Sequence, residues 1–300
     1  MANLATDNRI NPIRHTLRKH SKLSTMWKQL RKNPTGMIGF ILISIAILIG
    51  LLGDWIAPYD PSHAELTKKL LPPLTEGHLL GTDQLGRDIL SRIISGTKIS
   101  LMIGLTTVIF AGILGTTVGI VAGFFKGWVD TILMRIVDVQ LSFPFILLVL
   151  VINAVIGTGL KNIILSLVFA GWVSYARVIR SEVLALREKE FILACISVGV
   201  PKWEILVKHI VPNLLTPIVI LSSLQVASFI IAEASVSFLG FGVQPPQPAW
   251  GNMLNEGKDY IFSAWWLITF PGLAIVFTAL GVNLFGDWLR DVLDPESKSG

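Results

Sequence analysis

The sequence predicts an all-α integral membrane protein with six transmembrane helices. Hydrophobic residues make up 52% of the 300 residues and charged residues 15%, with a mean hydropathy of +0.65. A soluble domain usually carries about 25% charged residues. The chain also contains six apolar runs that are long enough to cross a hydrocarbon core of about 30 Å. Composition and run length therefore favour a bilayer over water.

The predicted spans are residues 37–56, 101–125, 132–156, 163–179, 214–238 and 264–285. The first is too long for a signal-peptide core and has no cleavage-type site after it, so we expect a retained helix. Pro144, Pro217 and Pro271 lie inside later spans, where neighbouring helices can satisfy the freed backbone groups.

The distribution of basic residues predicts the orientation. Residues 1–36 carry eight Lys or Arg side chains in 9–32 and one acid, Asp7, and we expect the first twenty residues to be disordered. Such basic flanks stay in the cytoplasm, and six spans then return the C-terminus to the same side. The expected division is a basic tail (1–36), a first span (37–57), an extracytoplasmic segment (58–99), a permease core (100–290) containing a cytoplasmic loop (181–213), and a tail (291–300).

The extracytoplasmic segment contains a double turn followed by a helix signal. Five basic residues are matched by five acids, and Asp88 is a good N-cap. Downstream, Ile89, Leu90, Ile93 and Ile94 share one side while Ser91 and Arg92 share the other. This amphipathic pattern predicts a helix lying in the membrane interface. His63 and His78 have no metal-ligand spacing and are expected to be surface residues.

Residues 190–214 are both helix-patterned and charged, and they lie between two spans. The expected apolar stripe comprises Phe191, Ile192, Cys195, Ile196 and Val198. Gly199 and Pro201 end this first helix, 202–210 form a second short helix, and Pro212 leads into the next span. The predicted unit is a helix–turn–helix in water that fits a groove on another protein; the alternative is an ordinary solvated hairpin.

Catalytic and metal-binding motifs are missing from the sequence. No G-x-x-x-x-G-K-[ST] pattern occurs, so the chain binds no ATP through a P-loop and is not an enzyme by itself. Two acids lie clearly within spans, Asp138 near the cytoplasmic interface and Glu233, and both are candidates for a translocation path. For Glu233 a packing role is the open alternative. The single cysteine, Cys195, excludes an internal disulfide. A secondary carrier would require a coupling-ion site and inverted repeats, which the sequence does not show.

Several segments together resemble one family. GTDQLGRDILSRIISGTKISL, LSFPFILLVLVINAVIGTGLKN, SYARVIRSEVLALREKEF, AEASVSFLGFGVQPPQPAWGNML and FGDWLRDVLDP occur in that order. They are similar to the C-type permease subunit of dipeptide, oligopeptide and nickel importers, over about residues 37–295. The signature turn of that subunit corresponds here to Gly81, Thr82, Asp83, Gly86, Arg87 and Asp88.

The cytoplasmic loop resembles the EAA-x3-G-x9-I-x-L-P pattern of importer permeases. Leu193, Ala194 and Cys195 occupy the EAA positions, followed by Gly199 and Pro212. His209 and Val211 replace the usual isoleucine and leucine, and Leu193 replaces the usual glutamate. The resemblance implies that this loop, from Glu190 through Pro201 to Pro212, couples the permease to an ATPase.

The resemblance implies a type I ABC importer in the inner membrane of a bacterium or archaeon. Its partners would be a second homologous permease, two ATP-binding subunits, an extracytoplasmic binding protein and the lipid bilayer, with no nucleic acid. The chain itself would bind no cofactor or metal, because the partner subunits hydrolyse ATP with Mg²⁺. Di- and oligopeptides are the expected substrates; nickel or a metal chelate, glutathione and opine-like compounds are the alternatives.

Overall fold

The computed structural model describes residues 22–75 and 77–293, and every regular element in these ranges is helical. The order is α1 (Lys22–Lys32), α2 (Pro34–Ile56), η1 (Leu66–Lys68), α3 (Ile89–Phe125), α4 (Gly127–Leu141), α5 (Phe145–Ile156), α6 (Leu160–Arg187), α7 (Glu190–Ser197), α8 (Lys202–Ile205), η2 (Leu206–Ile210), α9 (Val211–Phe238), α10 (Trp250–Gly257), η3 (Lys258–Tyr260) and α11 (Trp266–Leu293).

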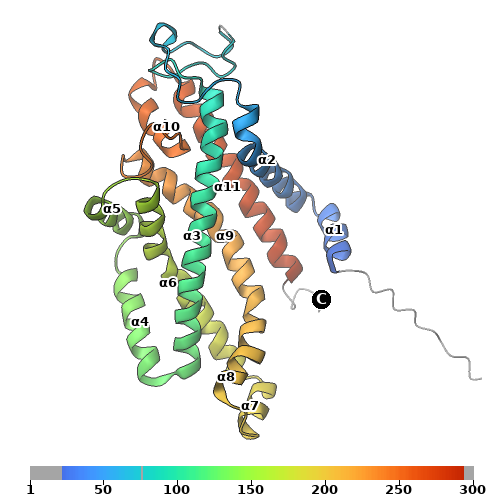
Figure 1. Ribbon diagram of the computed structural model, residues 1–300. Helices are drawn as coiled ribbons and strands as arrows, with labels where there is room; N and C mark the ends of the chain where they lie inside the picture. The colour runs from blue at the N-terminus through green and yellow to red at the C-terminus, as the bar shows by residue number, and fades with distance from the viewer. Residues whose placement is uncertain (1–21, 76, 294–300) are drawn as a thin grey trace, which may run out of the picture.

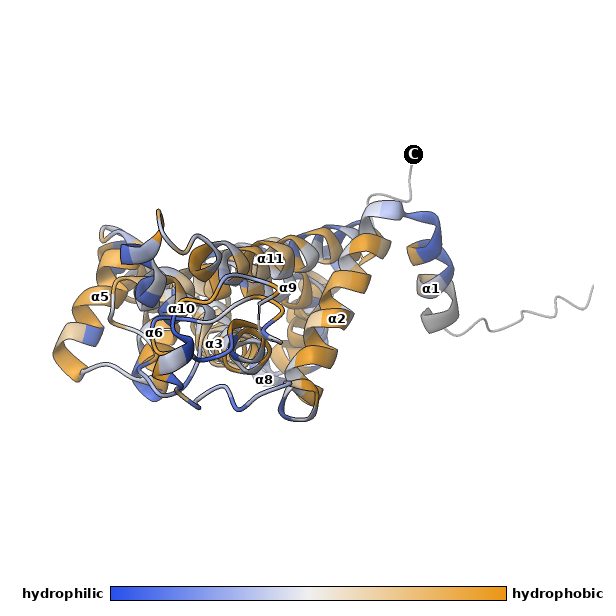
Figure 2. Cartoon of the chain, turned by 90° about the horizontal axis from the view of Figure 1, so that it is seen from above, coloured by the Kyte–Doolittle hydropathy of each residue, from blue (hydrophilic) through white to orange (hydrophobic). Residues whose placement is uncertain are grey.

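The helices form an elongated bundle with different structures at its two ends (Figure 1). Residues 57–88 and α10 lie at one end, and α7 and α8 lie at the other. The turn before α6 joins the α10 end, because the Gly159 N–H donates to the Gly242 carbonyl at 3.1 Å. Hydrophobic residues cover the outward faces of α2 and α5 in Figure 2, as a bilayer requires.

Within residues 22–75 and 77–293, five helices are long and apolar enough to span a membrane, and the third predicted span is not a straight helix. Residues 132–156 fall in α4 and α5, which meet at 89° across a short break. Pro144 explains the break, because proline donates no backbone hydrogen bond and disfavours helical geometry in the preceding residue. If the bent pair counts as one span, the described chain has the six that were predicted.

The expected interfacial helix after Asp88 is wrong as a separate element. Asp88 does cap it, since its Oδ2 accepts from the Ser91 N–H at 2.8 Å, but the helix continues through the second predicted span as α3, 37 residues long. Ser91 and Arg92, expected on its solvated side, are 0% and 2% exposed. The folded 57–88 segment and α10 cover the face that the sequence pattern assigns to water.

The second short helix of the cytoplasmic loop is also not separate. α8, the π-helical turn η2 and α9 follow one another without a break from Lys202 to Phe238. Pro212 lies in the first turn of α9, directly after η2. A proline supplies no N–H, and a local π turn is one way in which a helix accommodates the altered bonding.

Close helix contacts hold the bundle together. At Gly119 of α3, a Cβ would lie 2.7 Å from the Ala176 carbonyl oxygen of α6. Small residues permit this approach of two backbones, which is the usual basis of helix association within a membrane. α3 and α6 therefore pack as a tightly apposed pair along the length of the bundle.

The last part of the predicted N-terminal tail forms a helix, α1. α1 packs on α2 through Trp27, whose ring lies 5.6 Å from that of Phe40, and Leu30 is buried. Asn33 separates the two helices and caps α2, so the first apolar helix begins three residues earlier than predicted. The disordered stretch expected over the first twenty residues lies outside the described residues.

Candidate functional site

The coupling segment, residues 188–212, is anchored at its start by the ends of α3 and α6. Arg187, the last residue of α6, donates from Nη1 to the Phe124 carbonyl of α3 at 2.8 Å. Its guanidinium also lies over the Phe124 ring, 5.7 Å from the ring centre. A basic side chain at a helix C-terminus satisfies carbonyls that have no partner within the helix. The two helices therefore end as one unit where the coupling segment begins.

Gly199 makes the turn of the coupling segment, as the sequence predicts. Its φ is +78°, in the left-handed region, and the Val200 N–H donates to the Cys195 carbonyl at 3.0 Å. This is the usual way in which a glycine ends a helix. Pro201 then precedes α8 as its N-cap. A Cβ added at Gly199 would meet nothing within 4 Å, so backbone strain alone opposes a side chain there.

The predicted apolar stripe of α7 does not form one buried face. Ile192 is completely buried, whereas Phe191, Ile196 and Val198 are 43%, 48% and 81% exposed. Leu193, in the family's glutamate position, and Trp203 of α8 are exposed as well. The reason is that α7 has only eight residues, of which only Ile192 is buried and Cys195 is partly buried against the bundle. The coupling segment thus leaves an apolar surface exposed.

Cys195 and His209 pack inside the hairpin. The Cys195 sulfur lies 3.9 Å from His209 Nε2, and the Phe191 ring lies 6.4 Å from the imidazole. These two positions, which differ from the family pattern, therefore contact each other across the turn. Of the other predicted residues, Glu190, Ala194 and Pro212 are exposed and Val211 is half-buried.

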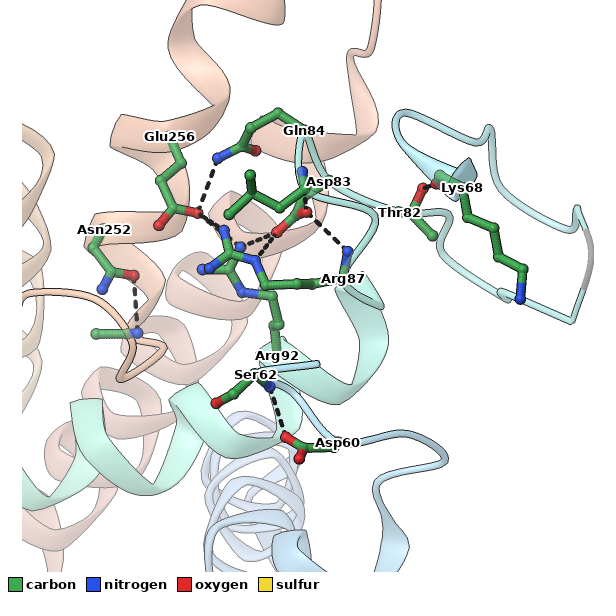
Figure 3. Close-up of polar contacts among 12 residues, drawn as sticks. Asp60, Ser62, Lys68, Thr82, Asp83, Gln84, Arg87, Arg92, Asn252 and Glu256 are labelled. Carbon is green, nitrogen blue, oxygen red and sulfur yellow. Dashed lines mark hydrogen bonds and ion pairs between the residues drawn. The ribbon is translucent and has the colours of Figure 1, made fainter. Parts of the chain in front are cut away.

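At the opposite end, which the sequence predicts to be extracytoplasmic, four charged side chains form a group that we call the external ion cluster: Asp83, Arg87, Arg92 and Glu256 (Figure 3). Arg87 donates from Nε to Asp83 at 2.6 Å and from Nη2 to Glu256 at 2.7 Å. Arg92 Nη1 contacts both carboxylates, with 2.7 Å to Glu256. Two positive and two negative groups balance, which is the condition for burying charge.

The other signature residues build the frame around this cluster. The Thr82 hydroxyl donates to the Lys68 carbonyl at 2.5 Å and accepts from the Leu71 N–H at 2.8 Å. Asp88 pairs with His78 Nδ1 at 2.9 Å. His78 is 5% exposed, so its predicted surface position is wrong. Gly81 and Gly86 both adopt positive φ.

Sequence reasoning missed Glu256. It lies on α10, more than 160 residues beyond the two arginines that it joins. The available signal was a pair of arginines, Arg87 in the predicted turn and Arg92 in the helix that follows it. Two such side chains need a second acid besides Asp83, but nothing local identifies which one.

A cavity of ≈ 490 Å³ opens between α4, α5, α6 and α9. Its lining is apolar apart from neutral amide and hydroxyl groups, namely Gln140, Ser174, Gln225, Ser228 and Ser235. No charged residue is among the described residues that line it. This wall offers hydrogen bonds without fixed charge.

The two acids predicted for a translocation path are not brought together on this wall. Asp138 pairs with Arg177 at 2.9 Å, and both side chains are more than half exposed. Glu233 is fully enclosed and accepts from the Ser237 and Ser100 hydroxyls at 2.7 and 3.5 Å. Ala232 and Ser235 line the cavity, but Glu233 does not. A role for either acid in the path stays a prediction.

Residues 115–299 match the family model of the binding-protein-dependent transport system inner membrane component. The chain belongs to this family. Residues 21–73 also match the N-terminal TM domain of oligopeptide transport permease C. The resemblance found in the sequence is therefore confirmed, and this chain is a multi-pass inner-membrane permease of an ABC importer.

Relatives match almost the whole chain. A dipeptide transport system permease protein from Alkalihalophilus pseudofirmus is 40% identical over 273 residues, which are 91% of this chain and 90% of the relative. A glutathione transport system permease protein from Pectobacterium atrosepticum is 39% identical, over 91% of both chains. A probable D,D-dipeptide transport system permease protein from Escherichia coli is 35% identical, over 96% of this chain and 95% of the relative.

The fold itself has a solved counterpart. The MetNI methionine ABC transporter, in an inward-facing form, contains a chain that superposes with a TM-score of 0.57 at 17% identity. The match covers 67% of this chain and 96% of that chain. The predicted type I importer permease fold is thus confirmed.

Proposed function

We propose that this chain is the membrane-spanning permease subunit of an ATP-driven importer of di- and oligopeptides. With a second, homologous permease it forms a translocation path for peptides that an extracytoplasmic binding protein delivers. The names of the relatives support this substrate class, because dipeptide and D,D-dipeptide permeases are among them. Two ATP-binding subunits supply the energy, and the chain itself binds neither ATP nor Mg²⁺.

The observation that carries the proposal is the exposed apolar surface of the coupling segment. Phe191, Leu193, Ile196, Val198 and Trp203 lie open to solvent on a compact turn that Gly199 sets. An apolar helix surface of this kind is a typical protein contact. The segment lies at the end of the bundle away from the external ion cluster, where an ATPase would dock (Figure 1).

In this mechanism the coupling segment transmits to the helices a preference for one of two packing arrangements. ATP binding closes the ATPase pair, the coupling segment moves with it, and the helices open the cavity towards the delivered peptide; hydrolysis reverses the change. Coupling requires that the ATPases bind the two states of the permease with different affinities. ATPases that bound both states of the permease with equal affinity would not shift the permease from one state to the other.

The cavity wall supports a peptide cargo of variable side chains. The neutral groups at Ser174, Gln225 and Ser228 can bond to peptide amides without selecting a charge. Glutathione is the second candidate, favoured by the relative at 39% identity that carries its name. Because glutathione is itself peptide-like, the same wall suits both cargoes, and the binding protein would separate them.

Reconstituted transport tests the proposal. The permease is placed in vesicles with its partner permease, the ATPases and the binding protein, and uptake of a labelled dipeptide and of glutathione is measured. We expect uptake that needs both ATP and the binding protein. Uptake that follows an ion gradient without ATP would instead support a secondary carrier, and uptake of glutathione alone would reassign the substrate.

A further inference from the structure

Polar contacts, more than apolar packing, hold α4 to the rest of the bundle. Of the fifteen residues of α4, all within the described chain, only Val137 is buried. Large apolar side chains such as Ile132, Ile136 and Val139 are exposed. The apolar packing of α4 is confined to one stretch, where Val137 and the half-buried Met134 lie against Trp172, Val173 and Ala176 of α6, and in lipid such packing carries no hydrophobic driving force. Its position must therefore depend strongly on its other contacts.

Two strong contacts join α4 to α6. Arg180 of α6 donates to both carboxylate oxygens of Asp130, from Nε at 2.5 Å and from Nη2 at 2.6 Å. This pair is 31% and 17% exposed, so it is largely shielded from water. A two-pronged pair of this kind fixes orientation as well as distance.

The second contact lies at the other end of α4. Gln140 accepts from the Trp172 indole N–H at 3.0 Å and donates to the Phe169 carbonyl at 2.8 Å. The amide thus bonds to α6 through both its oxygen and its nitrogen. Together with Asp130 and Arg180, it connects the start and the end of α4 to one neighbouring helix.

A third pair between the same helices contributes less. Arg177 and Asp138 meet at 2.9 Å, but their side chains are 60% and 55% exposed. Exposed single pairs contribute little, because water screens them and both side chains lose freedom. The polar attachment of α4 to α6 therefore depends mainly on the Asp130–Arg180 pair and the Gln140 amide.

These contacts lie between the coupling segment and the cavity. α6 leads directly into the coupling segment and is tied to α3 there by Arg187. At the far end of α4, Gln140, Leu141 and Phe143 line the cavity. α6 itself contributes Ala170, Gly171, Val173 and Ser174 to the lining, so its movement shifts that side of the cavity directly. The part of the wall that α4 supplies keeps its position relative to α6 only if α4 moves with α6.

We propose that the Asp130–Arg180 pair and the Gln140–Trp172 bond make α4 follow α6, so that the cavity wall moves with the coupling segment. Asp130, Arg180 and Trp172 are positioning residues in this scheme. The inference rests on the proposed function, since it assigns a route to the coupling that an ATP-driven importer needs. Without these contacts, ATP hydrolysis would continue while the part of the wall that α4 supplies no longer follows α6.

The test uses the complete reconstituted importer with Asp130→Asn, Arg180→Gln and Trp172→Phe. Trp172→Phe keeps an aromatic ring and removes the N–H, and Trp172 does not line the cavity. For each variant, the assembled complex, the hydrolysis stimulated by the binding protein and the dipeptide uptake per ATP are measured. We expect assembly and stimulated hydrolysis to persist while uptake per ATP falls about fivefold or more, the effect of losing an allosteric coupling free energy.

Asp54→Asn is the matched control. Asp54 pairs with Lys98 at 2.7 Å between α2 and α3 on an exposed surface, and Lys98 lies near the start of α3 whereas α4 follows its end. This variant removes the same charge and should leave uptake per ATP unchanged. The double variant Asp130→Arg with Arg180→Asp, which reverses the two charges, should restore a large part of the uptake per ATP that the single variants lose.

Two results would overturn the inference. One is an unchanged uptake per ATP in both Asp130→Asn and Trp172→Phe. The other is a loss of uptake that only parallels a loss of assembled complex, which would give these residues a structural role alone. If the unmodified complex showed no hydrolysis stimulated by the binding protein, the proposed function would fail instead, so the two failures are distinguishable.

Discussion

Arg87 and Arg92 lie buried against Asp83 and Glu256, and this balance of charge holds residues 57–88 onto α10. Removing one partner from a buried group of charges leaves an uncompensated charge, at a cost of roughly 3–5 kcal/mol. We therefore expect Glu256→Gln to lower the thermal stability of the purified complex strongly. Asp259→Asn, on the exposed side of η3, removes the same charge and should have little effect.

A melting temperature for Glu256→Gln within error of the Asp259→Asn control would contradict this prediction. It would mean that the two arginines find other acceptors when Glu256 is gone. Arg92 Nε has no partner within the described residues even in the intact cluster, so spare acceptors are scarce there.

Glu233 is expected to act through packing. Its carboxyl group accepts from Ser237 and Ser100 and is enclosed by α3 and α9. Glu233→Gln keeps the size and an acceptor oxygen, so assembly and peptide uptake should stay near normal. Glu233→Leu leaves the hydroxyl of Ser237 without this acceptor and should lower the amount of complex and the uptake in proportion. Lost uptake with intact assembly in Glu233→Gln would instead assign the residue to the translocation path.

At the scale of elements, the coupling segment depends on the left-handed turn at Gly199. A β-branched residue is strained in that conformation, at a cost of order 1–2 kcal/mol, whereas asparagine tolerates it. Gly199→Val should therefore misdirect α7 and weaken ATPase binding, and Gly199→Asn should stay close to the unmodified protein. Retention of the ATPases by solubilised complex and stimulation of hydrolysis measure this.

Because a Cβ at Gly199 meets no neighbouring atom, a steric clash cannot explain a difference between the two variants. If ATPase binding and stimulated hydrolysis both persist in Gly199→Val, the coupling segment is not the coupling element. The helices, which lie away from the change, should insert normally in both variants.

The helices also show the limits of prediction from local sequence patterns. Length and hydropathy predicted the apolar helices, and a local rule placed the cap of Asp88 and the turn of Gly199. The same rules predicted two separate helices where α3 is continuous, and one span where α4 and α5 form a bent pair. Polar residues such as Arg92 look solvent-facing in the sequence, and only their distant partners show that the helix continues beneath other structure.

At the scale of the whole molecule, the distribution of basic residues predicts that both termini are cytoplasmic. In a Cys195→Ala background, which restores the alanine of the family pattern, cysteines at the exposed positions Ser62 and Gln247 should react with a membrane-impermeant thiol reagent in intact cells. A cysteine at exposed Lys202 should react only after the membrane is opened.

Labelling at position 202 in intact cells would refute this orientation. Positions 62 and 247 lie at the same end of the bundle, because residues 57–88 bind α10 and α10 bonds to the Gln247 carbonyl. Labelling at one of them without the other would therefore contradict this packing.

The sequence by itself determined that this is a helical membrane permease with a signature turn and a helix–turn–helix loop that is predicted to couple it to an ATPase, because hydropathy, turn residues and motif spacing act over neighbouring positions. Only the tertiary structure decided which distant groups meet. It joined Glu256 to Arg92 across 164 residues and Glu233 to Ser100 across 133, and it bent the third span by 89°. Such pairings depend on how whole helices pack, and a buried charge takes whichever partner that packing brings within reach.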